Sequence, residues 1–285
     1  MTSARLDTAE HSITANGRRL FLQRLTLTDP DASVAPGPAE PPIVFLHEGL
    51  GAITLWKDFP SRLCAALGRG GVVYDRWGHG RSEPLGGPAR GSRPHGYHTT
   101  EVAALRDLLD AEGIERAVLF GHSDGGTIAL LAAALMPERV AAIVTLAAHV
   151  FVEDVSIAGI EDAATTFEAP DSRLRAALVR HHGIDRAERI FYAWADTWRD
   201  PAFRNWIIAG RLPTIACPAL VIQGADDAYG TPAQVDAITR GVSGPARPLL
   251  IEGCGHAPHL EAEDTVIAAM RDFLATVREN APRPS

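Results

Sequence analysis

One short segment, residues 121–126 (GHSDGG), constrains the fold of this chain more than any other. It follows the apolar run 117–120 and precedes the apolar helical pattern 127–136, which predicts a sharp turn from a strand into a helix with Ser123 at its apex. The flanking glycines let two backbone segments pack closely while the serine holds a strained conformation. A turn of this kind, a nucleophile elbow, lifts a serine hydroxyl above the sheet and aims the N–H of Asp124 at a nearby carbonyl oxygen. An incidental serine in a glycine-rich turn has the same pattern, so a base and an acid must also follow downstream.

Both follow, each after an apolar strand pattern. Asp227 ends the segment 224–227 (GADD), and His256 ends the segment 253–256 (GCGH). A serine hydroxyl attacks carbonyl groups poorly unless a base removes its proton, so we expect Ser123 as nucleophile, His256 as general base and Asp227 as the acid that orients the ring. Two other carboxylates stay open as the acid. Asp226 would exchange places with its neighbour after a one-residue shift, and Glu153 follows the preceding strand.

The chain resembles the α/β-hydrolase superfamily over nearly its whole length. The segments that carry this resemblance are His47-Glu48-Gly49, residues 75–82 (DRWGHGRS), the turn at Ser123, Gly224-x-x-Asp227 and Gly255-His256. Residues 121–126 and 148–154 are most similar to the valacyclovir-hydrolase, or biphenyl hydrolase-like, group of serine esterases. The resemblance implies the chain order Ser, Asp, His for the catalytic residues and a reaction without cofactor or metal.

Strand and helix patterns alternate along most of the chain, which predicts an α/β fold with a mostly parallel central sheet flanked by helices. The alternation stops between residues 149 and 212, where helical segments carry many of the aromatic side chains. We expect an inserted helical cap over the Ser123 turn. The chain is then divided into a first part of the α/β-hydrolase core at 1–148, the cap at 149–212 and a second part of the core at 213–285. Strands are expected at 19–28, 43–46, 72–74, 117–120, 140–147 and from 220 and 249; helices are expected at 55–67, 99–109, 127–136 and 262–277.

The loop after the strand at 43–46 is expected to complete an oxyanion hole. Relatives usually carry His-Gly-x there, and the resemblance implies that the x residue donates its N–H, which makes Gly49 and Asp124 the two donors. Glu48 then occupies a position that is normally glycine. Its carboxylate is either held by backbone N–H groups or by an arginine such as Arg76, which we otherwise assign to structure, or it contacts substrate.

Asp124 is a candidate for substrate specificity, because its carboxylate lies one residue from the nucleophile. It would attract a cationic amine in a low-dielectric pocket, or it caps the helix that begins there. His149, Trp194 and Trp198 are further candidates for contact with substrate, although aromatic residues at helical spacing are also typical of a cap core. The pairs His95/His98 and His181/His182 have no third ligand at a supporting spacing, so we expect solvated loop histidines and no metal site.

Composition limits the partners. A net charge of −8 argues against nucleic acid, which needs clustered basic residues. No segment is long and apolar enough to predict a membrane span, and the polar first residues lack a signal-peptide pattern. Three widely spaced cysteines fit reduced thiols, so we expect a cytoplasmic protein. The expected catalytic residues imply a small-molecule ester as the partner. The oligomeric state is not determined by these features.

The expected function is hydrolysis of small carboxylic esters through an acyl-enzyme intermediate, with a preference for amino-bearing esters. One alternative is a C–C bond hydrolase or lyase that uses the same three residues. Its anionic substrate would need basic groups, for which the candidates are Arg173, Arg175, Arg180 and Arg189. The other alternative is a ligand receptor that keeps the hydrolase scaffold.

Overall fold

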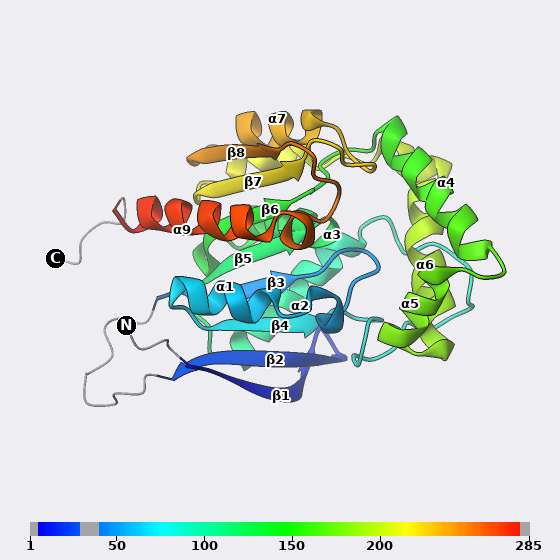
Figure 1. Cartoon of the computed structure of the whole chain (residues 1–285), viewed down its shortest axis with the longest axis horizontal. Helices are drawn as coiled ribbons and strands as arrows, with labels where there is room; N and C mark the ends of the chain where they lie inside the picture. Colours follow the sequence, from blue (N-terminus) through cyan, green and yellow to red (C-terminus); the bar gives the residue numbers. More distant parts are fainter. Residues whose placement is uncertain (1–4, 29–39, 280–285) are drawn as a thin grey trace.

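An eight-stranded sheet forms the centre of the molecule (Figure 1). The computed structural model describes residues 5–28 and 40–279, and its strands lie in the order β1-β2-β4-β3-β5-β6-β7-β8. The six strands β4, β3, β5, β6, β7 and β8 are parallel to one another, whereas β2 is antiparallel to both β1 and β4. The strands are β1 (Arg5–Ala15), β2 (Arg18–Thr28), β3 (Ile43–Leu46), β4 (Gly71–Asp75), β5 (Ala117–His122), β6 (Val140–Leu146), β7 (Ala219–Gly224) and β8 (Ala246–Ile251).

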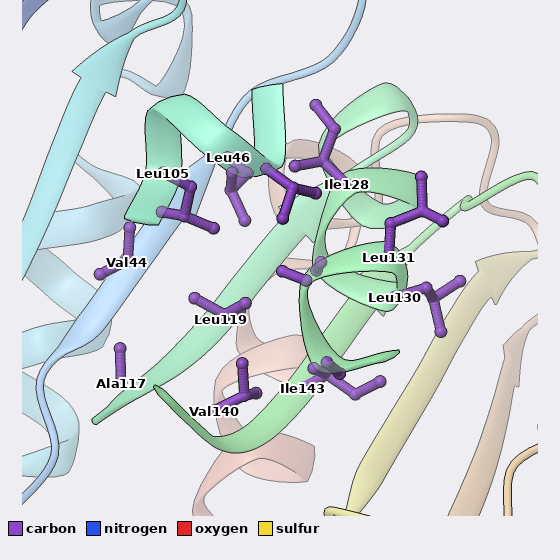
Figure 2. Packing of buried hydrophobic residues seen from close by; sticks show 14 of the residues in the cluster. Val44, Leu46, Leu105, Ala117, Leu119, Ile128, Leu130, Leu131, Val140 and Ile143 are labelled. Carbon is purple, nitrogen blue, oxygen red and sulfur yellow. The ribbon is translucent and has the colours of Figure 1, made fainter. Parts of the chain in front are cut away.

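Helices cover both faces of the sheet. The side chains of a strand alternate between these faces, and the central strands are buried on both. Val44 and Leu46 pack with α2, α3 and α7 on one face, whereas Ile43 and Phe45 pack with α1 and α9 on the other. Figure 2 shows the first of these clusters, in which α3 lies against β3, β5 and β6. The covering helices are α1 (Phe59–Leu67), α2 (Tyr97–Ala111), α3 (Asp124–Leu135), α7 (Pro232–Gly241) and α9 (Glu263–Glu279), and a short helix α8 (Pro258–Glu261) precedes the last of them.

A helical insert separates β6 from β7. It contains α4 (Asp154–Glu168), α5 (Arg173–His182) and α6 (Ile184–Arg199), which lie together at one end of the sheet (Figure 1). They share a small core of their own, in which the rings of Phe167 and Phe191 stack 3.8 Å apart. Two 3-10 turns follow, η3 (Pro201–Asn205) and η4 (Ala209–Thr214), and η4 packs against α3 and α7. The division of the chain at 148 and 212 stays a prediction.

The architecture confirms the expected α/β-hydrolase fold and adds elements that the sequence patterns did not predict. β1 and α7 were not expected, because β1 is a polar edge strand and α7 has a weak apolar pattern. The expected helix at 55–67 is divided at Lys57, whose φ of 54° ends the 3-10 turn η1 (Ile53–Trp56) before α1 begins. Residues 1–4 of the polar N-terminal stretch lie outside the described residues. No helix in the described part of the chain is both long and apolar enough to cross a bilayer.

The topology brings the ends of six strands to one edge of the sheet. The parallel strands β3, β4, β5, β6, β7 and β8 all end at this edge, so the loops that follow them meet there. Every residue that the sequence analysis assigned to a catalytic or oxyanion role lies in one of these loops or in the turn that opens α3.

Candidate active site

Ser123 stands at the turn between β5 and α3, where the backbone takes a conformation that few residues other than glycine adopt. Its φ is 52° and its ψ is −116°, and its N–H donates to the carbonyl of Leu146 over 2.8 Å. A Cβ on Gly121 would collide with the carbonyl of Gly125, and a Cβ on Gly125 would collide with the carbonyl of Leu46. The turn thus brings Ser123 into the wall of a cavity between the sheet and the helical insert.

His256 and Asp227 meet beside this cavity. Nδ1 of His256 lies 2.8 Å from Oδ1 of Asp227, which also accepts the N–H of Tyr229 over 2.8 Å. Because the carboxylate only accepts, Nδ1 carries the ring proton and Nε2 is left as an acceptor. Burial works to raise the pKa of Asp227, but the hydrogen bond and charge of His256 outweigh it and hold the pKa below its ordinary value. His256 lines the same cavity as Ser123.

The two alternative acids lie elsewhere. The side chain of Asp226 is exposed. Glu153 accepts from the hydroxyl of Thr231 at 2.6 Å and from the amide of Gln234 at 2.7 Å, which fastens the start of α4 to α7. Of the three carboxylates, the structure brings only Asp227 to the imidazole.

The loop after β3 turns its carbonyl groups into the protein. The three successive carbonyl oxygens of residues 48–50 lie within hydrogen-bonding distance of buried side chains. These contacts are Arg76 Nη2 to Glu48 at 2.8 Å, His79 Nε2 to Gly49 at 3.0 Å and His182 Nε2 to Leu50 at 2.9 Å. Gly49 lines the cavity, and a Cβ there would collide with the indole of Trp194. Within the described residues, neither the N–H of Gly49 nor that of Asp124 has a hydrogen-bond acceptor, so both amides are available to a developing oxyanion.

The cavity has a volume of about 300 Å³. Its outer wall is largely apolar and comes from the insert: Ile160 of α4, Leu174 and Leu178 of α5, and Trp194 and Trp198 of α6. Among the described residues, its lining contains one carboxylate, that of Glu48, and no lysine or arginine. The four cap arginines considered for an anionic substrate therefore do not reach it.

The structure supports one of the roles left open for Glu48, that of a carboxylate held by a backbone group, and its contact with substrate stays a prediction. Its Oε2 accepts the N–H of Leu50, so a backbone group does hold the carboxylate, and Arg76 contacts its carbonyl rather than its carboxylate. The side chain nevertheless lines the cavity. Burial raises its pKa, and the Leu50 N–H, His256 and Arg76 offset only part of this rise.

His149, Trp194 and Trp198 all line the cavity, and their contact with substrate stays a prediction. Nε2 of His149 lies 2.9 Å from the carbonyl of Tyr229, so it carries the proton, and the buried Nδ1 has no hydrogen-bond partner in the described structure. Burial lowers the pKa of His149, which keeps the ring neutral. Trp198 also belongs to the core of the insert, which was the alternative role weighed for the aromatic residues.

Of the two roles left open for the Asp124 carboxylate, contact with substrate is not supported, because Asp124 is absent from the cavity lining. Both of its oxygens lie 3.0 Å from the Tyr97 hydroxyl, and Arg76 Nη2 and His98 Nε2 lie 3.5 Å and 3.4 Å away. The residue is 3% exposed and is absent from the cavity lining. Burial opposes its ionisation, but these donors and charges hold the pKa of Asp124 below its ordinary value.

The expectation of solvated histidines is wrong for two of the four residues. His98 and His182 are buried, and His182 accepts the N–H of Gly80 at Nδ1. His95 pairs with Asp200 at 2.9 Å, while His181 lines the cavity. The described residues contain no group of three histidine, cysteine or acidic side chains that could hold a metal ion. Sequence spacing held no signal for these positions, because each partner comes from a distant part of the chain.

The chain is similar to known hydrolases. The model of the alpha/beta hydrolase family matches residues 43–269. Over 210 residues the chain is 31% identical to serine hydrolase BPHL of Homo sapiens, an alignment that covers 71% of this chain and 68% of that protein. It is 29% identical to esterase YbfF of Escherichia coli (strain K12), with 60% of this chain and 72% of that protein covered.

Solved structures share the fold. A bacterial membrane phospholipase A, described as a virulence factor, superposes with a TM-score of 0.74 at 22% identity, covering 96% of this chain and 87% of that one. A thermophilic esterase from Thermogutta terrifontis superposes with a TM-score of 0.69 at 18% identity, covering 94% and 99%. At these identities the similarity concerns the fold alone.

Proposed function

The chain belongs to the alpha/beta hydrolase family, and on that premise we propose that it is a serine hydrolase that cleaves small carboxylic esters through an acyl-enzyme intermediate. One observation carries the proposal. His256 is hydrogen-bonded to Asp227 at 2.8 Å, and His256 shares a cavity of about 300 Å³ with Ser123, which sits on a strained turn. These are the parts that acyl transfer by an activated serine requires.

Each residue has a defined part in the reaction. Nε2 of His256 takes the proton of the Ser123 hydroxyl as the serine oxygen bonds to the ester carbonyl carbon. The carbonyl oxygen becomes negative and accepts the N–H groups of Gly49 and Asp124. His256 then gives its proton to the leaving alcohol, and the C–O bond of the ester breaks. A water molecule repeats the sequence on the acyl-enzyme, which releases the acid and restores Ser123.

The cavity supports a substrate of limited size. Its volume and its apolar outer wall suit a short acyl or alcohol group. The carboxylate of Glu48 supports a preference for esters that carry an amine. It is the one anionic side chain among the described lining residues, which include no lysine or arginine that would repel a cation. The preference that sequence reasoning attached to Asp124 therefore moves to Glu48.

Removal of the nucleophile tests the proposal. Ser123→Ala should lower kcat for p-nitrophenyl acetate by about 10⁴- to 10⁶-fold, as in comparable triads. Asp227→Asn should lower kcat by about 10⁴-fold, because the amide favours the wrong ring tautomer. Asp226→Asn is the matched control, since its exposed side chain should leave kcat within about twofold.

Two results would contradict the proposal. Substantial activity in Ser123→Ala would reject the serine as nucleophile. Stoichiometric labelling of Ser123 by a fluorophosphonate without repeated turnover of any ester would instead indicate a ligand receptor built on the same scaffold. Folding of each variant is checked by circular dichroism and thermal unfolding, so that loss of structure is not mistaken for loss of chemistry.

A further inference from the structure

One buried arginine contacts both segments that carry the oxyanion donors. Arg76 follows β4 and its side chain is fully buried. Its Nη2 donates to the carbonyl of Glu48 over 2.8 Å and lies 3.5 Å from Oδ2 of Asp124. The carbonyl of Glu48 belongs to the same peptide group as the N–H of Gly49, and Asp124 carries the other N–H. A single guanidinium thus ties the loop after β3 to the start of α3.

Because of the peptide geometry, this contact also fixes the direction of the Gly49 N–H. The described chain has no cis peptide bond, so the Glu48 carbonyl and the Gly49 N–H point in opposite directions. With the carbonyl held at Arg76, the N–H points away from Arg76. A cation at a carbonyl oxygen also polarises the amide and makes its N–H a stronger donor.

Two further groups hold the same carbonyl. Gly51 donates its N–H to it over 3.0 Å, and Nδ1 of His47 lies 2.7 Å from it. The N–H of Arg76 donates to Nε2 of His47 over 3.0 Å, so Nδ1 is the nitrogen that carries the ring proton. Burial lowers the pKa of His47 well below its ordinary value, and the charge of Arg76 adds to this effect, which keeps the ring in that neutral tautomer. Arg76 therefore supports the peptide both directly and through His47.

Buried charges of opposite sign surround Arg76. Its Nη1 lies 3.7 Å from Glu101, which pairs with Arg93 at 2.7 Å, and Asp124 also accepts the Tyr97 hydroxyl. Two cations thus face two anions. Removal of one partner from a buried ion pair is destabilising, because it leaves the other charge without compensation. Nε and Nη1 of Arg76 nevertheless lack hydrogen-bond partners in the described structure.

We propose that Arg76 is a positioning residue of the oxyanion hole: it orients the Glu48–Gly49 peptide toward the cavity and fixes that peptide to the helix start at Asp124. This inference rests on the proposed serine hydrolase function. It also gives the Asp124 carboxylate a purpose, because this group anchors the guanidinium from the side of the nucleophile.

The first test is Arg76→Lys, which keeps the charge but replaces the planar fork by a single point donor. We expect kcat for p-nitrophenyl acetate to fall about 10- to 100-fold, since complete loss of one oxyanion donor costs about 10²- to 10³-fold. KM should stay within about threefold. The Ki of propylboronic acid, which forms a tetrahedral adduct with the serine oxygen, should rise by the same factor as kcat/KM falls, because the adduct uses the oxyanion hole as the transition state does.

Arg69→Lys is the matched control. Arg69 is also a buried arginine that bonds a backbone carbonyl and a carboxylate, those of Pro41 and Glu40, but it lies at the opposite end of the strands. Its replacement should lower thermal stability without changing kcat or the boronate Ki.

A charge-balanced variant separates positioning from electrostatic stability. In Arg76→Met combined with Asp124→Asn, one buried cation and one buried anion are removed together. We expect its melting temperature to recover relative to Arg76→Met alone, while kcat and the boronate Ki stay impaired. If this double variant and Arg76→Lys both fold and keep wild-type kcat and boronate affinity, the inference is wrong. That outcome differs from failure of the proposed function, in which Ser123→Ala stays active or the wild-type protein forms no boronate adduct.

Discussion

Two carboxylates near the nucleophile have opposite environments. Burial opposes ionisation of Asp124, but His98, Arg76 and Arg93 hold its pKa below the ordinary value. Glu48 has one backbone donor and an apolar cavity in front of it, and burial raises its pKa. The first is therefore a permanent structural anion, and the second is an anion that a substrate amine would stabilise.

Glu48→Gln tests the role of that anion. We expect kcat/KM for alanine ethyl ester to fall about 10-fold, since one partly buried ion pair is lost, while ethyl propionate, which lacks the amine, changes by less than about threefold. An equal fall for both esters would show that Glu48 supports the loop and does not recognise an amine.

The same pair of esters gives a pH dependence with a defined sign. The raised pKa of Glu48 means that its carboxyl group gains a proton as the pH falls through a value above the usual one for glutamate. An α-amine is protonated below about pH 7.7, so the attraction is lost on the acidic side when Glu48 becomes neutral. KM for alanine ethyl ester should therefore rise as the pH falls, KM for ethyl propionate should not, and Glu48→Gln should remove the difference.

The turn from β5 into α3 depends on the packing of a whole element. The apolar side of α3 lies against β3, β5 and β6, as Ile128, Leu119 and Val44 illustrate in Figure 2. This packing presses the start of the helix onto the end of β3, where Gly125 meets the carbonyl of Leu46. The helix start and the oxyanion loop are therefore held in register by the same contact.

Gly125→Ala should break that register. Its Cβ would collide with the Leu46 carbonyl and lie 2.8 Å from the carbonyl of His47, so we expect a loss of about 2–3 kcal/mol in the free energy of unfolding. For a chain of this size that corresponds to a fall of about 5–10 °C in Tm. Gly210→Ala is the control, because no atom lies within 4 Å of a Cβ there; its Tm should change by less than about 2 °C. Equal stability of the two variants would contradict the close approach at Gly125.

Across the whole molecule, buried imidazoles link stability to pH. Seven of the eleven histidines are buried and have pKa values lowered chiefly by burial. A histidine with a lowered pKa is neutral in the folded state, whereas the unfolded chain binds protons below about pH 6.5. Stability is thus fully present above pH 6.5 and falls as the pH drops toward the folded-state pKa values. Glu48 and Asp75, whose pKa values burial raises, take up protons in the folded state and offset part of this fall.

His182 allows the effect to be measured for one residue. Its pKa is lowered to about 4, so between about pH 6.5 and that value it contributes a slope of about 1.4 kcal/mol per pH unit to the free energy of unfolding. His182→Gln should reduce the slope measured by urea unfolding by this amount. Thr197→Val, which removes a buried hydroxyl without a titratable group, should lower stability and leave the slope unchanged. A slope unaffected by His182→Gln would disprove the linkage.

Local patterns were sufficient for the parts of the fold that depend on neighbouring residues. The strand at 43–46 was predicted with the bounds that the structure has, because a four-residue apolar run that follows two prolines is too short for a helix and is typical of a buried strand. The α/β-hydrolase resemblance is confirmed, since glycines at fixed offsets around Ser123 encode a tight turn in a few consecutive residues. The roles of Ser123, His256 and Asp227 stay a prediction, although the structure brings the last two together.

Tertiary contacts decided where polar side chains point. Arg76 was assigned to structure alone, because its two partners at the site lie 28 and 48 residues away in the chain. The carboxylate of Asp124 points inward for the same reason. β1 was not predicted, because its polar residues form a strand only by pairing with β2. Turns and apolar periods are properties of consecutive residues and can be read from them. The direction and the charge of a buried polar group are set by partners that only folding brings within a few ångströms.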